Sequence, residues 1–260
     1  MTENHPFHMV EKSPWPVMSA ASITQMMVGT VMMFQQKSTM MMLMGTIMMI
    51  MTMIQWWRDI VRESTYQGKH LKAVIKGIKW GMIMFIISEV FFFLSMFWMF
   101  FHSSLSPTPQ LGSTWPPMGI STFNPMKIPM LNTMVLLTSG ISITWAHHSL
   151  LNNNMSETNY SLMMTIMLGV YFSALQSYEY TNATFTMSDS SYGSSFFMMT
   201  GFHGVHVIIG STFLLICMKR QMNNHFSKMH HLGFEAAAWY WHFVDMVWLL
   251  LYASIYWWGN

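Results

Sequence analysis

KWGMIMFIISEVFFFLSMFWMFFH, residues 79–102, is an apolar run long enough to cross the hydrocarbon core of a bilayer. The run carries one carboxyl group near its middle, Glu89. Only 8% of the 260 residues are charged, against roughly 25% in a soluble globular domain. A chain this poor in charge lacks the polar surface that a soluble protein needs, so the composition indicates a polytopic membrane protein.

Seven segments of the sequence have about the 20 residues that a membrane-spanning helix requires. They cover residues 15–34, 39–57, 77–101, 129–148, 160–178, 195–218 and 235–257. Because backbone N–H and C=O groups in lipid must find partners within their own segment, each is expected to be helical. The predicted fold is therefore all-α, a polytopic membrane protein with seven transmembrane helices in a single membrane domain over residues 1–260.

Lys and Arg residues are distributed unevenly between the two membrane sides that seven helices create. Of the 12, ten fall on the side of the N-terminus and two, Lys37 and Lys127, fall on the other. The ten are Lys12, Arg58, Arg62, Lys69, Lys72, Lys76, Lys79, Lys219, Arg220 and Lys228. Since positively charged connectors stay on the side of synthesis, we expect the N-terminus to face that compartment. The net charge of +2, without a basic block, gives no indication of nucleic acid binding.

Glu89 has no hydrogen-bond donor among the side chains on its own helix face. Those neighbours are Met82, Phe85, Ile86, Phe92, Phe93 and Met96. An ionised side chain at the bilayer centre costs about 2.5–3.5 kcal/mol, so another helix or a lipid must supply a partner, or the carboxyl must be neutral. Two interpretations stay open, a proton-handling carboxyl and a protonated Glu hydrogen-bonded between helices, and we favour the second.

A second set of ionisable residues lies in the last two predicted helices. His203 and His206 are one turn apart on one face. Glu235 and His242 are seven residues apart, and Asp245 follows one turn later. We expect these five side chains to form an interhelical hydrogen-bond network, with an iron or zinc site as the alternative. Because metal ligands are usually arranged more densely, we expect no metal site on this chain.

Three glycines, Gly201, Gly204 and Gly210, lie in the stretch GFHGVHVIIG. Small residues let the backbones of two membrane helices approach closely. We therefore expect this helix to pack against a neighbour along its glycines.

Two histidine pairs, His147–His148 and His230–His231, lie at predicted helix ends on the basic side. Their spacing does not fit the histidine boxes of membrane desaturases. We interpret them as interfacial donors to phosphate groups or to partner chains.

Several motifs resemble the subunit III family of mitochondrial cytochrome c oxidase. The motifs are WWRDIVRES, FIISEVFFF, HSSLSPTPQLGSTWPP, GISITWAHHSL, GVYFSALQSYEY, TGFHGVHVIIGSTFL and HHLGFEAAAWYWHFVDMVWLLLYASIYWWG. The resemblance runs from HMVEKSPWP to the C-terminus. The 34 methionines and the lack of transit-peptide character in the N-terminal residues suggest an invertebrate mitochondrial gene product.

The resemblance implies an arrangement of two helices (15–66) and five helices (72–258), separated by a cleft that holds phospholipids such as cardiolipin or phosphatidylglycerol. It places the chain in the mitochondrial inner membrane as a multi-pass protein, with its N-terminus in the matrix. The implied partners are subunits I and II, small accessory subunits and membrane phospholipids. Membership of a respiratory supercomplex stays open.

The resemblance also implies the function. The oxidase complex transfers electrons from cytochrome c to dioxygen with proton pumping, and haem a, haem a3 and copper belong to partner subunits. This chain is then a non-catalytic subunit with no redox centre and no catalytic residue. It would stabilise subunit I, hold phospholipids and support proton uptake.

The resemblance assigns roles to individual positions. Glu89 matches the intramembrane carboxyl of the family. Positions that line the lipid cleft match Trp57, Glu63, His70 and Arg220. Arg62 lies among the same cationic residues at headgroup level, and we include it in the lipid site. A matrix-facing histidine cluster that feeds protons to subunit I matches His5 and His8.

Two other functions compete with this one. The first is a histidine-dependent membrane metalloenzyme, which would bind stoichiometric iron or zinc through His203, His206 and His242. The second is a stand-alone proton transporter, which would transport protons as an isolated chain in vesicles. We find no internal repeat of the kind that favours a transporter.

Overall fold

The computed structural model describes residues 7–35 and 37–260. Over these residues the chain forms seven long α-helices and no strands, which confirms the all-α prediction. The chain divides into two compact units, with the boundary between Ile78 and Lys79. This boundary lies inside α3 (Lys72–Leu105), whereas the family resemblance divides the helices between residues 66 and 72.

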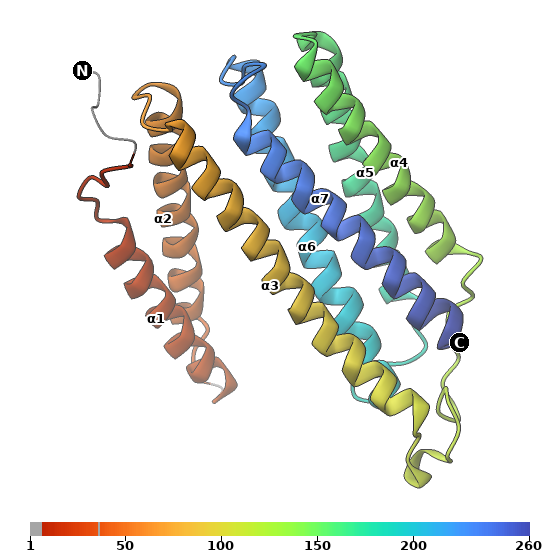
Figure 1. Cartoon of the computed structure of the whole chain (residues 1–260). Helices are drawn as coiled ribbons and strands as arrows, with labels where there is room; N and C mark the ends of the chain where they lie inside the picture. The colour runs from red at the N-terminus through yellow and green to blue at the C-terminus, as the bar shows by residue number, and fades with distance from the viewer. Residues whose placement is uncertain (1–6, 36) are drawn as a thin grey trace. The chain divides into compact units, whose positions relative to one another are not determined.

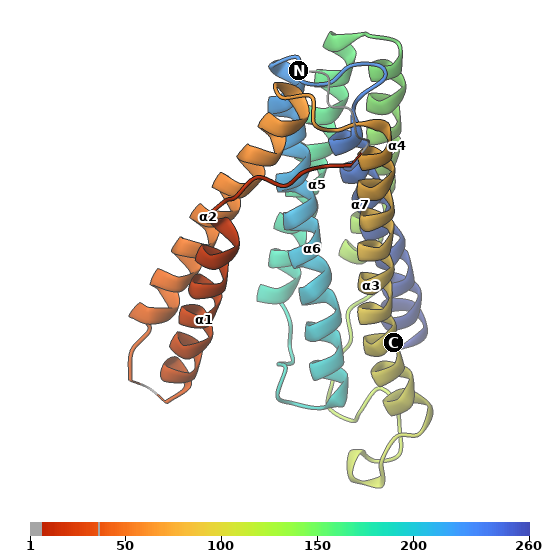
Figure 2. The same cartoon turned by 60° about the vertical axis from the view of Figure 1, so that its left-hand side comes forward.

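The first unit contains α1 (Trp15–Phe34) and α2 (Met40–Thr65), which run antiparallel and side by side in Figures 1 and 2. Glycines allow the close approach of the two helices. A Cβ atom at Gly45 would lie only 2.6 Å from the backbone nitrogen of Met26 on α1. Any larger residue at this position would therefore push the two backbones apart.

A long-range hydrogen bond joins the two ends of this helical pair. The indole Nε1 of Trp15, at the start of α1, donates to Oδ2 of Asp59 near the end of α2 at 2.7 Å. The contact helps to fix the register of α1 along α2, because it joins one defined position on each helix. It involves a carboxylate acceptor, and such hydrogen bonds are stronger than those between neutral groups.

The second unit begins within α3 and contains four further α-helices (Figure 1). They are α4 (Ile128–Leu151), α5 (Met155–Thr181), α6 (Ser191–Met222) and α7 (Leu232–Leu251), which continues as a π-helix, η2 (Tyr252–Trp258). A short 3₁₀-helix, η1 (Pro109–Leu111), lies in the loop after α3. Consecutive helices from α4 to α7 pack on one another, and α7 also packs on α4.

Trp241 lies at the centre of this unit and is fully buried. Its indole Nε1 donates to Oγ of Ser139 on α4 at 2.9 Å. Glycines on the other two helices make room for the ring, since a Cβ atom would lie 2.6 Å from it at Gly169 and 2.9 Å from it at Gly210. The core of the unit is thus built on one large aromatic residue and the small residues that face it.

Of the three glycines in GFHGVHVIIG, Gly210 alone makes a close contact among the described residues, and the neighbour is a side chain, Trp241. A Cβ atom at Gly201 would make an ordinary contact of 3.8 Å, and one at Gly204 would meet open space among the described residues. The prediction was wrong for these two glycines. Nine residues advance an α-helix by about two and a half turns, so Gly210 faces away from Gly201.

Five of the helices are long and apolar enough to cross a membrane: α1, α2, α3, α4 and α6. Helices α5 and α7 have at least 20 residues each but are not among these five. The seven predicted segments therefore all correspond to helices, and a membrane crossing is supported by composition for five of them.

Candidate functional site

Glu89 has its partner on α6. Its Oε2 atom lies 3.0 Å from Nε2 of His206, a residue 117 positions further along the chain. Helix α3 itself offers no donor to the carboxyl, as the sequence indicated. Of the two sources of a partner that the sequence left open, another helix or a lipid, the structure provides the helix.

The second ring nitrogen determines how many protons this pair holds. Nδ1 of His206 lies 2.6 Å from the carbonyl oxygen of Phe202, which can only accept, so Nδ1 carries a hydrogen and donates it. A neutral ring then has a bare lone pair at Nε2. The contact with Glu89 therefore requires one further proton, either on the carboxyl or on the ring.

Aromatic rings surround the pair. The His206 ring packs edge-on against Phe93 at 5.0 Å between centroids and stacks with Tyr240 at 6.3 Å. The Glu89 side chain is 23% exposed and that of His206 is 10% exposed. The pair therefore lies in a largely apolar environment, and which of the two groups holds the proton stays a prediction.

His203, His242 and Asp245, which we also expected in the network, contact other groups. The Nε2–H of His203 donates to the carbonyl oxygen of Val244 at 3.2 Å. Nδ1 of His242 lies 4.0 Å from Oδ2 of Asp245, which is too long for a hydrogen bond. Asp245 faces α4, where a Cβ atom at Gly140 would lie 2.8 Å from Oδ2.

Glu235 belongs to a different group again. Its Oε2 forms an ion pair with Nζ of Lys79 at 2.5 Å, and its Oε1 lies 3.5 Å from Nε2 of His231. The five residues expected to form one network thus contact separate sets of partners, and a single network among them stays a prediction.

One grouping in the first unit was not expected. Nε2 of His8 lies 3.5 Å from Oε2 of Glu63, and the His8 ring packs edge-on against His70 at 6.4 Å. The structure therefore brings a predicted proton-uptake histidine next to two predicted lipid-site residues. His5, the other predicted histidine, lies outside the described residues.

The other predicted lipid-site residues offer indole and cationic groups. Trp57 is 57% exposed, and Nη1 of Arg62 lies 3.7 Å from Oδ1 of Asp59. In the second unit the guanidinium carbon of Arg220 lies 4.5 Å from the centre of the Phe226 ring. Its Nε atom is buried and has no hydrogen-bond partner in the part of the chain that the structure describes. A lipid role for these residues stays a prediction.

The sequence analysis missed a buried carboxyl, Glu179. Its side chain is fully buried near the end of α5, with the Tyr256 hydroxyl beside it. Close by along the chain, Gln176 accepts from Nδ2 of Asn132 at 3.5 Å. The predicted span 160–178 stopped one residue short of this glutamate. The signal that could have identified it was a charged residue between two tyrosines, in SYEYT.

A second missed grouping contains His147, His231 and Glu235, whose ligating atoms all lie within 4.8 Å of one another. The sequence analysis noted both histidine pairs and the glutamate. Their meeting could not be predicted, because it depends on how α7 packs against α4.

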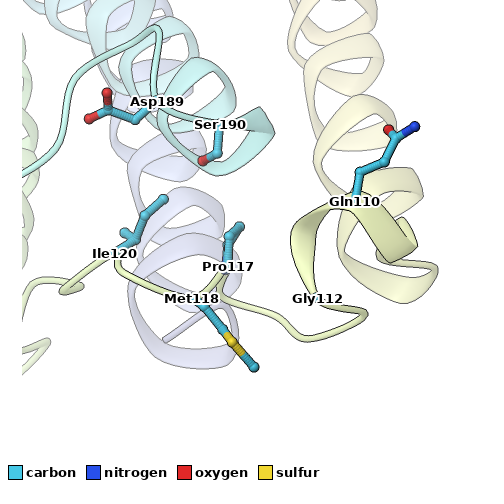
Figure 3. Close-up of a pocket in the computed structure, with 7 residues that line it drawn as sticks. All are labelled: Gln110, Gly112, Pro117, Met118, Ile120, Asp189 and Ser190. Atoms are coloured by element: carbon cyan, nitrogen blue, oxygen red, sulfur yellow. The ribbon is translucent and has the colours of Figure 1, made fainter.

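A shallow pocket lies between the loop after α3 and the start of α6 (Figure 3). Its lining residues are Gln110, Gly112, Pro117, Met118, Ile120, Asp189 and Ser190. The carboxylate of Asp189 already accepts a hydrogen bond from the backbone N–H of Thr186 at 2.6 Å. Its charge therefore serves the local turn, and we assign no ligand to this pocket.

Known proteins match the chain over nearly its whole length. The family described as "Cytochrome c oxidase subunit III" matches residues 5–260. "Cytochrome c oxidase subunit 3" of Aedes aegypti is 61% identical over 257 residues, which are 99% of this chain and 98% of the relative. The proteins of the same name from Drosophila melanogaster and Equus caballus are each 60% identical and cover 99% of this chain.

Proposed function

The chain belongs to the cytochrome c oxidase subunit III family, and from this premise we propose that it is a non-redox core subunit of that oxidase. The oxidase transfers electrons from cytochrome c to dioxygen and pumps protons across the mitochondrial inner membrane. The observation that carries the proposal is the family match over residues 5–260, together with relatives of that name that are about 60% identical over 99% of this chain. Within the complex, this chain would stabilise subunit I, hold phospholipids and support proton uptake, with its N-terminus in the matrix.

The contacts of Glu89 support a structural role rather than a redox role. Oε2 of Glu89 lies 3.0 Å from Nε2 of His206, so the carboxyl is engaged in a contact between α3 and α6. One proton shared between them would join the two helices without placing a net charge in the apolar interior. Such a contact stabilises the surface that the chain presents to its partner subunits.

Support for phospholipid binding comes from Arg220. Its guanidinium carbon lies 4.5 Å from the centre of the Phe226 ring, and its Nε has no hydrogen-bond partner among the described residues. Phosphate oxygens of an anionic headgroup accept such donors in a fork geometry. In the first unit, Trp57 supplies the amphipathic ring that is typical of headgroup level.

Removal of this chain from the assembled oxidase tests the proposal. We expect the depleted complex to retain the absorption of both haems and of copper and to start turnover at a normal rate. Its activity should then decay faster during continuous turnover, because the support of subunit I is lost. The measurement is oxygen consumption against time, with the intact complex and a complex that has regained the chain as controls.

Two results would contradict the proposal. Loss of a haem or copper signal along with the chain would assign a redox centre to it. An unchanged lifetime of the depleted complex would show that the chain does not stabilise its partners.

A further inference from the structure

Three metal-ligand side chains meet where α4 ends and α7 begins. His147 lies in the last turns of α4, His231 directly precedes α7, and Glu235 lies in the first turn of α7. Their ligating atoms lie within 4.8 Å of one another. We propose that His147, His231 and Glu235 bind a zinc ion.

The distances between the ligand atoms fit a tetrahedral zinc ion. With Zn–N and Zn–O bonds of about 2.0–2.1 Å, neighbouring ligand atoms at the corners of a tetrahedron lie about 3.3 Å apart. Nε2 of His147 lies 3.4 Å from Nε2 of His231, and Oε1 of Glu235 lies 3.5 Å from the same nitrogen. These two separations match a tetrahedral site, and the ligating atoms of His147 and Glu235 lie within 4.8 Å of each other.

The tautomer of His231 suits a metal ligand. Its Nδ1 lies 3.0 Å from the carbonyl oxygen of Ser227, so Nδ1 carries the hydrogen and donates it. Nε2 of the neutral ring then presents a lone pair toward His147 and Glu235. Zinc-binding histidines usually donate their other ring nitrogen to a carbonyl or carboxylate in this way.

Lys79 holds the carboxylate of Glu235 in position through an ion pair. Its Nζ forms an ion pair with Oε2 at 2.5 Å, which leaves Oε1 directed toward His231. The Glu235 side chain is 18% exposed, so water and ions have access to the group. The ion pair holds the carboxylate in place, with Oε1 on the side of His231.

Without a cation, the contacts are poorly matched. A hydrogen bond from His147 to Nε2 of His231 would be long at 3.4 Å. The 3.5 Å between Oε1 of Glu235 and Nε2 of His231 is also longer than an ordinary hydrogen bond. A dipositive ion between the three atoms would replace these two long contacts with three bonds.

Two histidines and one glutamate form a ligand set that zinc accepts, with a fourth position open for water. The ion would join α4 to α7 directly, and α3 to both through Lys79. This proposal revises the expectation that the chain has no metal site. It does not depend on His203, His206 or His242, and the ion it names has no redox chemistry.

The test compares zinc binding by assembled oxidase that carries variants of this chain. The complex is treated with a chelator and then titrated with zinc against a competing metal indicator. We expect Glu235→Gln and His231→Gln each to weaken the binding of one zinc ion at least about tenfold. The control is His148→Gln, which removes the adjacent histidine that lies outside the ligand group and should leave the affinity unchanged.

X-ray absorption at the zinc edge provides a second readout. The spectrum of the unmodified complex minus that of Glu235→Gln should show nitrogen and oxygen neighbours at about 2.0–2.2 Å and no sulfur. If His231→Gln fails to assemble, Glu235→Gln decides alone, because it keeps the shape of the side chain. Equal affinity and stoichiometry in the unmodified complex and in Glu235→Gln would overturn the proposal, as would an equal loss in His148→Gln.

Discussion

His206 uses one ring nitrogen for its own helix and the other for Glu89. The bond to Phe202 leaves only a lone pair on the side of the carboxyl, so the two residues are joined through a single proton. The carboxyl, which has no partner on its own helix, is therefore paired with His206 across α3 and α6. We propose that the pair is structural and at most modulates proton movement in the oxidase.

We expect Glu89→Gln to leave assembly and initial turnover largely intact. A glutamine N–H can donate to the lone pair of His206, so the stability of the complex should change by less than ~1 kcal/mol. By contrast, His206→Leu leaves the carboxyl without a partner and should destabilise the complex by about 1–3 kcal/mol. Native gels and initial oxygen consumption measure both effects. Loss of the assembled complex in Glu89→Gln would contradict the interpretation.

At the scale of the helices, α6 shows how two faces of one helix can differ. Gly210 faces the buried ring of Trp241, whereas a Cβ atom at Gly204 would meet open space among the described residues. Both are glycines in one apolar helix, and only their rotation about its axis distinguishes them.

Alanine substitutions at the two glycines form a matched pair. Gly210→Ala places a methyl group 2.9 Å from the Trp241 ring, so the ring must shift and its bond to Ser139 must weaken. We expect a loss of about 1–3 kcal/mol, as is typical of an overpacked core. Gly204→Ala should not destabilise this chain. Thermal unfolding of the complex compares the two, and equal effects would show that the Trp241 contact does not limit packing.

At the scale of the whole molecule, the residues that we predicted to bind lipid are distributed over both compact units. Trp57, Arg62, Glu63 and His70 lie in the first unit, and Arg220 lies in the second. The two units are separate bodies in terms of their packing, each with its own internal contacts. We propose that Arg62 and Arg220 bind the headgroups of anionic phospholipids.

Arg220→Ala is expected to reduce the amount of anionic phospholipid that copurifies with the oxidase and to shorten its catalytic lifetime. The reason is that the guanidinium of Arg220 would form charge-assisted hydrogen bonds to the phosphate of an anionic headgroup. The neighbouring exposed cation provides the control, since Lys219→Ala removes the same charge from the solvent-facing side of α6. Mass spectrometry of the bound lipids measures the effect, and an unchanged lipid content in Arg220→Ala would refute it.

The fold class and the helix positions followed from the sequence alone. Long apolar segments form helices in lipid because their backbone N–H and C=O groups must find partners within the segment. Segments of about 20 residues are easy to recognise in a sequence. The family could also be predicted from the sequence, because its motifs extend over nearly the whole chain. The need of Glu89 for a partner outside its own helix was also predictable, since its helix neighbours were visible in the sequence.

The identity of that partner was decided only by the tertiary structure, as were the burial of Glu179 and the meeting of His147 with Glu235. Helices such as α3 and α4 are apolar on all sides, so their sequences carry no stripe that indicates which face turns inward. The rotation of each helix, and hence the contacts of its few polar groups, comes from the packing of large rings such as Trp241 against glycines on neighbouring helices.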